Sequence, residues 1–293
     1  MDELLVGVDG SEESRTALRW AAGAGDVLGL PLRVLSAWEY PTDAALSVGR
    51  LELPTPDEAD AAVEARLAEL LAEAGITGDR PVVAQAVRGS AAEALLRAAN
   101  DGVRMLVVGS RGLGGFRGLR LGSVSRQLVE HAPRPVTVVR ADTDVSPVRL
   151  RTVLVAVDGS EDSARAMTFA ARVAVDAGAE LVVVNATGWR DTQQSPAGEV
   201  LIDLDTRRSW VEEWCTPLRD AGIPYRSEVV RGDPRSALPE FARDVSADLV
   251  VVGSRGRGPV TGLVLGSVAT SLVERCEVPV TVLPHLDASA PFA

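Results

Sequence analysis

The stretch that decides the fold is VVGSRGLGGFRGLRLGSV, residues 107–124. Residues 251–268 read VVGSRGRGPVTGLVLGSV, and 13 of these 18 positions are identical at an offset of 144. The beginning of the chain is repeated as well, because residues 4–21 read LLVGVDGSEESRTALRWA and residues 153–170 read VLVAVDGSEDSARAMTFA. A period of this length corresponds to two whole domains rather than to a solenoid. The chain is therefore a tandem duplication.

Short apolar runs alternate with helical patterns in each copy. The runs are rich in Val and Leu without polar alternation, which is typical of strands buried on both faces. In the first copy the runs lie near 4–8, 32–37, 81–87, 104–108 and 135–140, and the helical patterns near 12–28, 56–74, 91–101 and 123–131. In the second copy the runs lie near 152–157, 180–186, 225–230, 248–252 and 279–284. The alternation predicts α/β domains, each with a parallel sheet and helices on both faces.

Length and composition agree with two domains. A chain of 293 residues corresponds to about two domains of roughly 150 residues, and 46% hydrophobic residues are enough for two cores. We expect the domains at residues 1–143 and 150–293. The linker runs from Ala141 to Leu150, where Pro147 and several Asp residues indicate an exposed segment.

The charged residues exclude several classes of function. All 30 basic residues are Arg, and 41 acidic residues give a net charge of −11. Without Lys the chain has no Walker-type phosphate loop, no protein-kinase site and no Schiff-base nucleophile. The acidic balance argues against a nucleic-acid ligand. Neither a signal peptide nor an 18-residue apolar run is present, so we expect a cytoplasmic protein that does not enter membranes.

The two cysteines, Cys215 and Cys276, form no C-x-x-C motif and are too few for a structural zinc site. Because both lie in helix-like stretches, we expect ordinary buried thiols.

Glycines cluster between the fourth strand and the last helix of each copy. Glycine lets backbone N–H groups approach an anion closely and accepts a positive φ. A helix then begins at Gly122-Ser123 or Gly266-Ser267, and its free N–H groups favour a phosphate. The alternative is a flexible connection without a ligand, which the recurrence at fixed spacing disfavours. The clustered glycines of the first copy are Gly109, Gly112, Gly114, Gly115, Gly118 and Gly122, and Gly253, Gly256 and Gly266 recur at the same spacing in the second copy.

Acidic residues distinguish the last helix of each copy from the others. The first helix begins SEE at residues 11–13 and SED at residues 160–162, and these acids would repel a phosphate. The third helix begins SAAE at residues 90–93, a capping-box pattern that satisfies its own N–H groups. The last helix, from Ser123 or Ser267, has no acid in its first turn. We therefore expect the phosphates at this helix.

Asp9 and Asp158 follow the first strand of each copy, in the sequence VDGS. In open α/β sheets, ligands bind beyond the carboxyl ends of the strands where the strand order reverses. If the first and fourth strands are neighbours, Asp9 faces the glycine loop, and we favour a role in binding the ribose hydroxyls. The alternative is a turn residue before the N-cap Ser11.

Each half resembles a universal stress protein domain of the ATP-binding type. The motif of that family, G-x2-G-x9-G-(S/T), matches Gly109, Gly112 and Gly122-Ser123, and then Gly253, Gly256 and Gly266-Ser267. The tandem arrangement resembles that of actinobacterial members. The resemblance implies two doubly wound domains, each with a five-stranded parallel sheet of order 3-2-1-4-5. It also implies one ATP in the crevice between strands 1 and 4 of each domain, with Mg²⁺ entering together with ATP.

The resemblance further assigns residues to the ATP. Adenine would lie near Gly7 and Ala37 in the first copy and near Ala156 and Ala186 in the second. The other candidates, for ribose and phosphates, are Asp9, Gly109, Ser110, Arg111, Gly112, Leu113, Gly114, Gly115, Gly122, Ser123, Val124 and Ser125 in the first copy, and Asp158, Gly253, Ser254, Arg255, Gly256, Arg257, Gly258, Gly266, Ser267 and Val268 in the second.

Two differences predict that the second site binds ATP more weakly. Ser125 is matched by Ala269, which removes a hydroxyl expected near the terminal phosphates. Gly115 is matched by Pro259, which removes a backbone N–H donor.

We predict an ATP-binding regulatory protein of the stress response. The alternative is a slow ATPase or another ATP-consuming enzyme on the same fold. Fast transfer is disfavoured, because it needs a positioned base, a metal clamp and usually a Lys or an Arg finger. His131 and His285 lie outside the glycine loops, and we expect surface or packing roles for both. A scaffold with degenerate sites is a third reading, which the intact motifs disfavour. The final strands, PVTV at 135–138 and 279–282, would pair the halves as an intrachain pseudo-dimer, and a further homodimer is left open.

Overall fold

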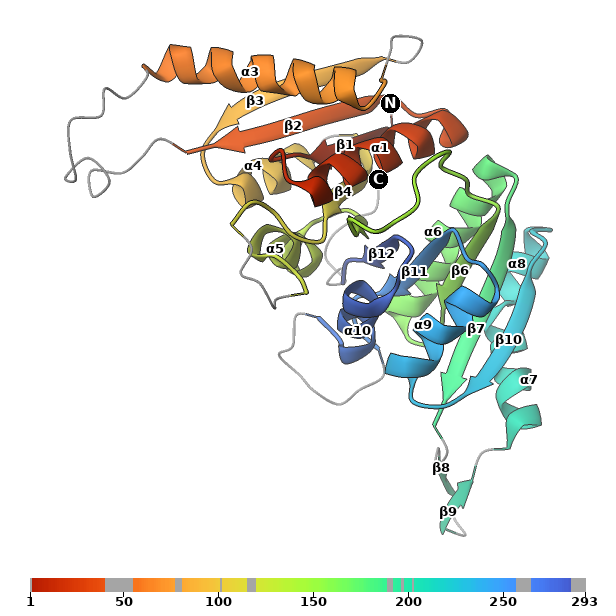
Figure 1. Cartoon of the computed structure of the whole chain (residues 1–293). Helices are drawn as coiled ribbons and strands as arrows, with labels where there is room; N and C mark the ends of the chain where they lie inside the picture. Colours follow the sequence, from red (N-terminus) through yellow and green to blue (C-terminus); the bar gives the residue numbers. More distant parts are fainter. Residues whose placement is uncertain are drawn as a thin grey trace. The chain divides into compact units, whose positions relative to one another are not determined.

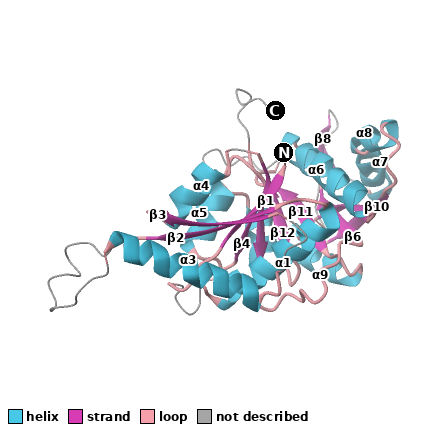
Figure 2. Ribbon diagram, turned by 90° about the horizontal axis from the view of Figure 1, so that it is seen from above, coloured by secondary structure: helices cyan, strands magenta, loops and turns pink. Residues whose placement is uncertain are grey.

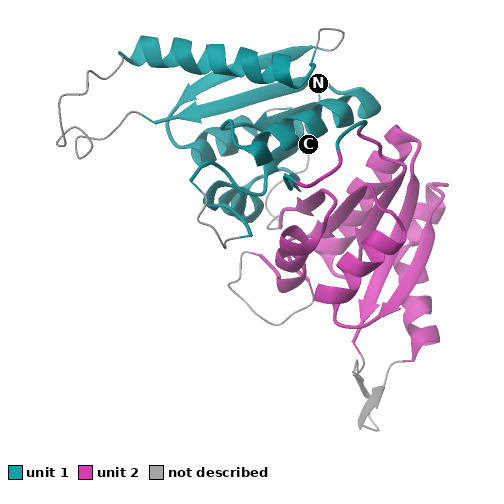
Figure 3. Ribbon diagram, in the orientation of Figure 1, with its two compact units in different colours: residues 1–141, 145–147 teal, residues 142–144, 148–293 magenta. Residues whose placement is uncertain are grey.

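The structure, a computed structural model, describes residues 2–39, 55–76, 81–100, 102–114, 120–188, 192–195, 198–201, 203–256 and 265–285. The chain divides into two compact units (Figure 3). Unit 1 consists of residues 1–141 and 145–147, and unit 2 of residues 142–144 and 148–293. Among the described residues, no helix has both the length and the apolar character needed to cross a membrane.

Strands and helices alternate along unit 1 (Figure 1). The strands are β1 (Glu3–Gly7), β2 (Leu32–Trp38), β3 (Val82–Arg88), β4 (Val103–Gly109) and β5 (Val136–Val139). The helices are α1 (Glu12–Leu28), α3 (Pro56–Glu73), α4 (Ala91–Ala98) and α5 (Ser123–His131). The strands pair in parallel in the order β3-β2-β1-β4-β5. The predicted fold class and the order 3-2-1-4-5 are therefore confirmed.

Unit 2 repeats this plan in the parallel order β10-β7-β6-β11-β12. The strands are β6 (Thr152–Ala156), β7 (Glu180–Thr187), β10 (Arg226–Arg231), β11 (Leu249–Gly253) and β12 (Val280–Leu283). The helices are α6 (Glu161–Ala177), α7 (Leu204–Trp214), α8 (Thr216–Asp220), α9 (Pro234–Asp244) and α10 (Ser267–Arg275). An antiparallel hairpin, β8 (Thr192–Ser195) and β9 (Gly198–Leu201), was not predicted, because TQQS has no apolar residue.

Helices cover both faces of each sheet. In unit 1, Figure 2 shows α3 on one side of β2 and β3 and α4 on the other. The consecutive residues Leu4, Leu5 and Val6 of β1 are all 0% exposed, which requires cover on both faces. This burial explains why the strands lack polar alternation.

The first helix of each unit begins and ends with matching local signals. Ser11 and Ser160 accept hydrogen bonds at the N-termini of α1 and α6 from the backbone N–H groups of Ser14 and Ser163. Both helices end at a glycine with a φ close to 65°, which only glycine adopts without strain. These caps fix the turn that carries the first-strand aspartate.

Candidate functional site

Each unit contains a cavity at the carboxyl edge of its sheet. In unit 1 it has a volume of about 330 Å³ and lies between the ends of β1, β2 and β4, the glycine loop and the first turns of α4 and α5. In unit 2 it has a volume of about 490 Å³, and the ends of β6, β7 and β11 and the first turns of α9 and α10 line it. Both lie where the strand order reverses, as predicted for a ligand crevice.

Most predicted site residues line these cavities. In unit 1 they are Gly7, Asp9, Ala37, Gly109, Arg111, Gly112, Leu113, Gly114, Gly122, Ser123, Val124 and Ser125. In unit 2 they are Ala156, Asp158, Ala186, Gly253, Ser254, Arg255, Gly256, Gly266, Ser267 and Val268. Ser110 is buried at 4% exposure and is not among the lining residues. Gly115, Arg257, Gly258 and Pro259 lie outside the described residues.

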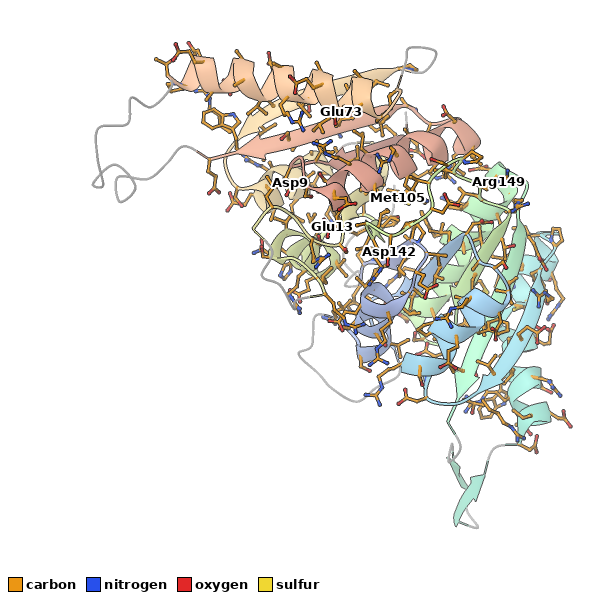
Figure 4. All side chains as sticks on the ribbon, viewed as in Figure 1. Asp9, Glu13, Glu73, Met105, Asp142 and Arg149 are labelled. Atoms are coloured by element: carbon orange, nitrogen blue, oxygen red, sulfur yellow. The ribbon has the colours of Figure 1, made fainter. Side chains whose placement is uncertain are left out.

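Asp9 connects the end of β1 to both the α1 turn and the glycine loop (Figure 4). Its Oδ1 atom accepts hydrogen bonds from the Ser11 backbone N–H at 2.9 Å and the Ser11 hydroxyl at 2.6 Å. Its Oδ2 atom accepts one from the Leu113 backbone N–H at 2.8 Å. Asp9 is therefore a turn residue, as the alternative reading proposed, and it also holds the loop. In unit 2, Asp158 accepts the same pair of bonds from Ser160.

These contacts determine the charge of Asp9. Burial raises the pKa of the Asp9 carboxyl, but the hydrogen bonds from Ser11 and Leu113 outweigh burial and hold that pKa below its ordinary value. Asp9 is therefore a carboxylate at neutral pH.

The described loop glycines are needed because neighbouring atoms approach their Cα atoms closely, and not because their φ angles are positive. A Cβ atom on Gly112 would overlap the Asp9 carboxylate, and one on Gly256 would overlap that of Asp158. A Cβ on Gly109 would lie 2.8 Å from the backbone carbon of Glu13. The described glycines of the two loops are absent from the positive-φ residues, so the expected left-handed turns are not found among them.

The starts of α5 and α10 leave backbone N–H groups without a side-chain cap. Gly122 and Gly266 occupy the N-cap positions, and the first turns hold no acidic residue. The predicted capping box at residues 90–93 is wrong, because the Ser90 side chain makes no cap hydrogen bond at its ψ of 130°. Glu93 nevertheless keeps a negative charge in the first turn of α4. The starts of α5 and α10 therefore remain the better anion sites.

Ser125 has a different contact from the one expected. Its side chain is buried, and its hydroxyl donates a 2.6 Å hydrogen bond to the Gly109 carbonyl oxygen. The hydroxyl thus joins α5 to the end of β4.

An acidic residue in the first turn of α1 and α6 also reaches the glycine loop. In unit 1, Glu13 Oε1 forms a 2.6 Å ion pair with the Arg111 guanidinium. In unit 2, Asp162 Oδ2 accepts a 3.1 Å hydrogen bond from the Arg255 backbone N–H, and Asp162 Oδ1 lies 2.9 Å from His285 Nδ1. From the sequence these acids were expected to act only as charges on the helix dipole, and His285 to have a surface or packing role. The sequence signal that could have indicated these contacts is that an acidic residue recurs at this position in both copies.

The ionisable groups that line the cavities are few. Among the described residues they are Asp9 and Arg111 in unit 1, and Asp158 and Arg255 in unit 2. Across the described part of the chain, no group of three or more His, Cys, Asp or Glu side chains could hold a metal ion. His131 ends α5 with a side chain that is 55% exposed.

Fold and site together define a tandem α/β protein with a cavity in each unit that is lined by a glycine loop and by a helix start without a side-chain cap. Comparison with protein families matches residues 1–140 and 149–284 to the universal stress protein family. The chain belongs to this family.

Related proteins match this chain over nearly the full length of both sequences. The chain is 33% identical to universal stress protein Rv2005c of Mycobacterium tuberculosis, over 95% of this chain and 96% of that protein. It is 30% identical to a universal stress protein of Mycolicibacterium smegmatis, over 96% of both chains. The crystal structure of a universal stress protein from Archaeoglobus fulgidus covers 96% of this chain and 98% of its own, with a TM-score of 0.70 at 23% identity. That likeness supports the fold.

Proposed function

We propose that each unit binds one ATP in its cavity and that the protein is an ATP-binding regulator of the stress response. One observation carries the proposal: in both units the cavity meets a glycine loop and a helix start that has neither a side-chain cap nor a first-turn acid. Free backbone N–H groups at such a helix start favour phosphate. Membership of the universal stress protein family agrees with this class of function.

The contacts of Asp9 leave room for a ribose. A carboxylate offers about four acceptor positions, and three receive the hydrogen bonds from Ser11 and Leu113. The remaining position on Oδ2 can accept a ribose hydroxyl. Adenine would then lie against Gly7 and Ala37, and the phosphates against the glycine loop and the first turn of α5.

One of the two reasons for expecting weaker ATP binding in unit 2 no longer holds. The Ser125 hydroxyl already donates to Gly109, so its replacement by Ala269 removes a contact between α5 and the end of β4 rather than an unused hydroxyl donor. Pro259 still lacks the N–H group of Gly115 and lies outside the described residues. A weaker second site stays a prediction, which ATP affinities of the two single-site variants would test, and a tighter second site would contradict it.

Slow hydrolysis is the alternative activity. Among the described lining residues each cavity has one carboxylate, Asp9 or Asp158, and it already accepts hydrogen bonds from a neighbouring serine, so it is a poor base for activating water. Mg²⁺ would enter with the nucleotide through phosphate oxygens. We therefore propose binding without rapid turnover, and phosphate release under excess ATP measures it.

Identifying the nucleotide released from the purified, denatured protein tests the proposal most directly. Calorimetry should then give two ATP per chain. Asp9→Ala combined with Gly122→Val should reduce this to one, while thermal unfolding verifies that the variant folds. A stoichiometry that stays at two would contradict the site assignment.

Other expectations from the sequence stay proposals. They are the pairing of the two PVTV strands as an intrachain pseudo-dimer, a homodimer, the exclusion of nucleic acid and a cytoplasmic location. Light scattering of the purified chain measures the oligomeric state with and without ATP.

A further inference from the structure

The two cavity arginines differ in what their guanidinium groups contact. Arg111 forms a 2.6 Å ion pair with Glu13, whose side chain is only 12% exposed. The Arg255 guanidinium has no hydrogen bond or ion pair in the described part of the chain, and Arg255 is exposed. The positive charge of Arg111 is thus largely compensated, whereas that of Arg255 is not.

The acid of unit 2 is held by other partners. Asp162 occupies the position of Glu13, and its side chain is 4% exposed. It is ion-paired with Arg165, and its carboxylate lies 2.9 Å from His285 Nδ1. In the described part of the glycine loop, its donors are the Ser254 hydroxyl and the backbone N–H of Arg255. Asp162 therefore fixes the loop backbone without compensating the Arg255 side chain.

Unit 1 lacks the groups that hold Asp162. Thr16 stands where unit 2 has Arg165, and Ala141 where it has His285. Glu13 is also one methylene longer than Asp162, which lets its carboxylate reach the Arg111 guanidinium. The different pairing of the two arginines thus follows from three substitutions outside the glycine loop.

The Cα atoms of both arginines lie beside the N-termini of α5 and α10. A Cβ atom on Gly122 would lie 3.2 Å from the Arg111 Cα, and one on Gly266 would lie 3.6 Å from the Arg255 Cα. Because Gly266 is the N-cap of α10, a phosphate bound there lies next to Arg255.

We infer that Arg255 makes unit 2 discriminate nucleotides by phosphate charge, favouring a nucleoside triphosphate over a monophosphate, and that Glu13 withholds Arg111 from this role in unit 1. The inference rests on the proposed function, because it needs a nucleotide in the cavity. A hydrogen bond from a guanidinium to phosphate is charge-assisted and strengthens with the charge of the acceptor.

The test for unit 2 uses the full chain with Gly122→Val, so that only the second site binds. Arg255→Gln should weaken ATP binding by about tenfold, the low end for a charged hydrogen bond, and AMP binding by much less. Arg172→Gln is the matched control, because Arg172 is an exposed arginine of α6 that does not line the cavity. It removes the same charge and should change neither affinity.

The reciprocal test uses Gly266→Val, which leaves the first site. Glu13→Gln should release Arg111 and strengthen ATP binding more than AMP binding, and thermal unfolding verifies that each variant folds. Equal changes in ATP and AMP affinity, or an Arg255→Gln variant that behaves like Arg172→Gln, would overturn the inference. If the unchanged chain binds no adenine nucleotide at all, the proposed function itself has failed.

Discussion

Replacing Asp9 with Asn tests how the glycine loop of unit 1 is attached to the sheet. The substitution preserves shape and removes the charge. Asn has one acceptor oxygen and one NH₂ donor in place of two acceptor oxygens. Its oxygen can keep the Ser11 backbone hydrogen bond of 2.9 Å, but its NH₂ group then meets the Leu113 N–H, which donates to Asp9 at 2.8 Å. The opposite orientation loses the Ser11 bonds instead.

The variant therefore loses one hydrogen bond to a charged acceptor, which is worth about 1.5–3 kcal/mol. Leu113 is 74% exposed, so water can solvate its released N–H group, and the low end applies. About 1.5 kcal/mol corresponds to roughly a tenfold shift toward a detached loop. Because the loop is one wall of the cavity, we expect ATP affinity at unit 1 to fall by about the same factor.

Hydrogen exchange and calorimetry measure the two consequences separately. The Leu113 amide should exchange about tenfold faster in Asp9→Asn. ATP affinity at the first site should fall in a chain that also carries Gly266→Val. Asp2→Asn is the control, because Asp2 is exposed, precedes β1 and does not line the cavity. Unchanged exchange at Leu113 would refute the role of Asp9 in holding the loop, whatever the change in affinity.

Three further predictions follow from the same contacts. The pKa of Asp9 is lowered in the folded protein, so its contribution to the stability of unit 1 is complete above the ordinary value of 3.8 and is lost as the pH falls through the folded pKa. Acid unfolding of unit 1 should therefore depend less on pH in Asp9→Asn, and circular dichroism measures it. Gly112→Ala should lower the melting temperature because its Cβ would overlap Asp9, whereas Gly114→Ala, whose Cβ meets nothing within 4 Å, should not. Burial, with the Glu212 charge, raises the pKa of the Cys215 thiol to about 11, and Cys276 is 2% exposed. Both cysteines should react with a thiol reagent only after denaturation, and reaction of either in the folded protein would contradict this.

Much of the fold could be predicted because the buried strands lack polar alternation and the chain repeats itself. The run predicted at 32–37 is β2, Leu32–Trp38, and the run at 248–252 is β11, Leu249–Gly253. The β8-β9 hairpin escaped prediction because TQQS carries no apolar signal. Strand order could not be derived from periodicity, since parallel neighbours are set by crossover connections, and it came from the family resemblance instead.

The positions of the glycines and of Asp9 around the cavity could be predicted, but the contacts between side chains could not. Glycine spacing and the position of Asp9 depend on local sequence, which the duplication made visible. The capping-box pattern at 90–93 failed because the Ser90 backbone does not bring its hydroxyl to the first turn. The contact between Asp162 and His285 joins residues 123 positions apart, where α6 meets the second residue after the end of β12 at Leu283. Such a contact requires the fold to be known first.

The absence of Lys bears on how the two sites can differ. Backbone N–H groups in the glycine loop and at the helix start depend on side-chain identity only where a proline such as Pro259 removes one, so divergence of the copies leaves most of this part of the site in place. The charge that supplements it comes from Arg, whose pKa is too high for the group to lose its proton at neutral pH. Its effect must therefore be adjusted through a neighbouring acid, as Glu13 does for Arg111 and Asp162 does not for Arg255. Two units with one fold can thus acquire different preferences for nucleotide charge through residues outside the glycine motif.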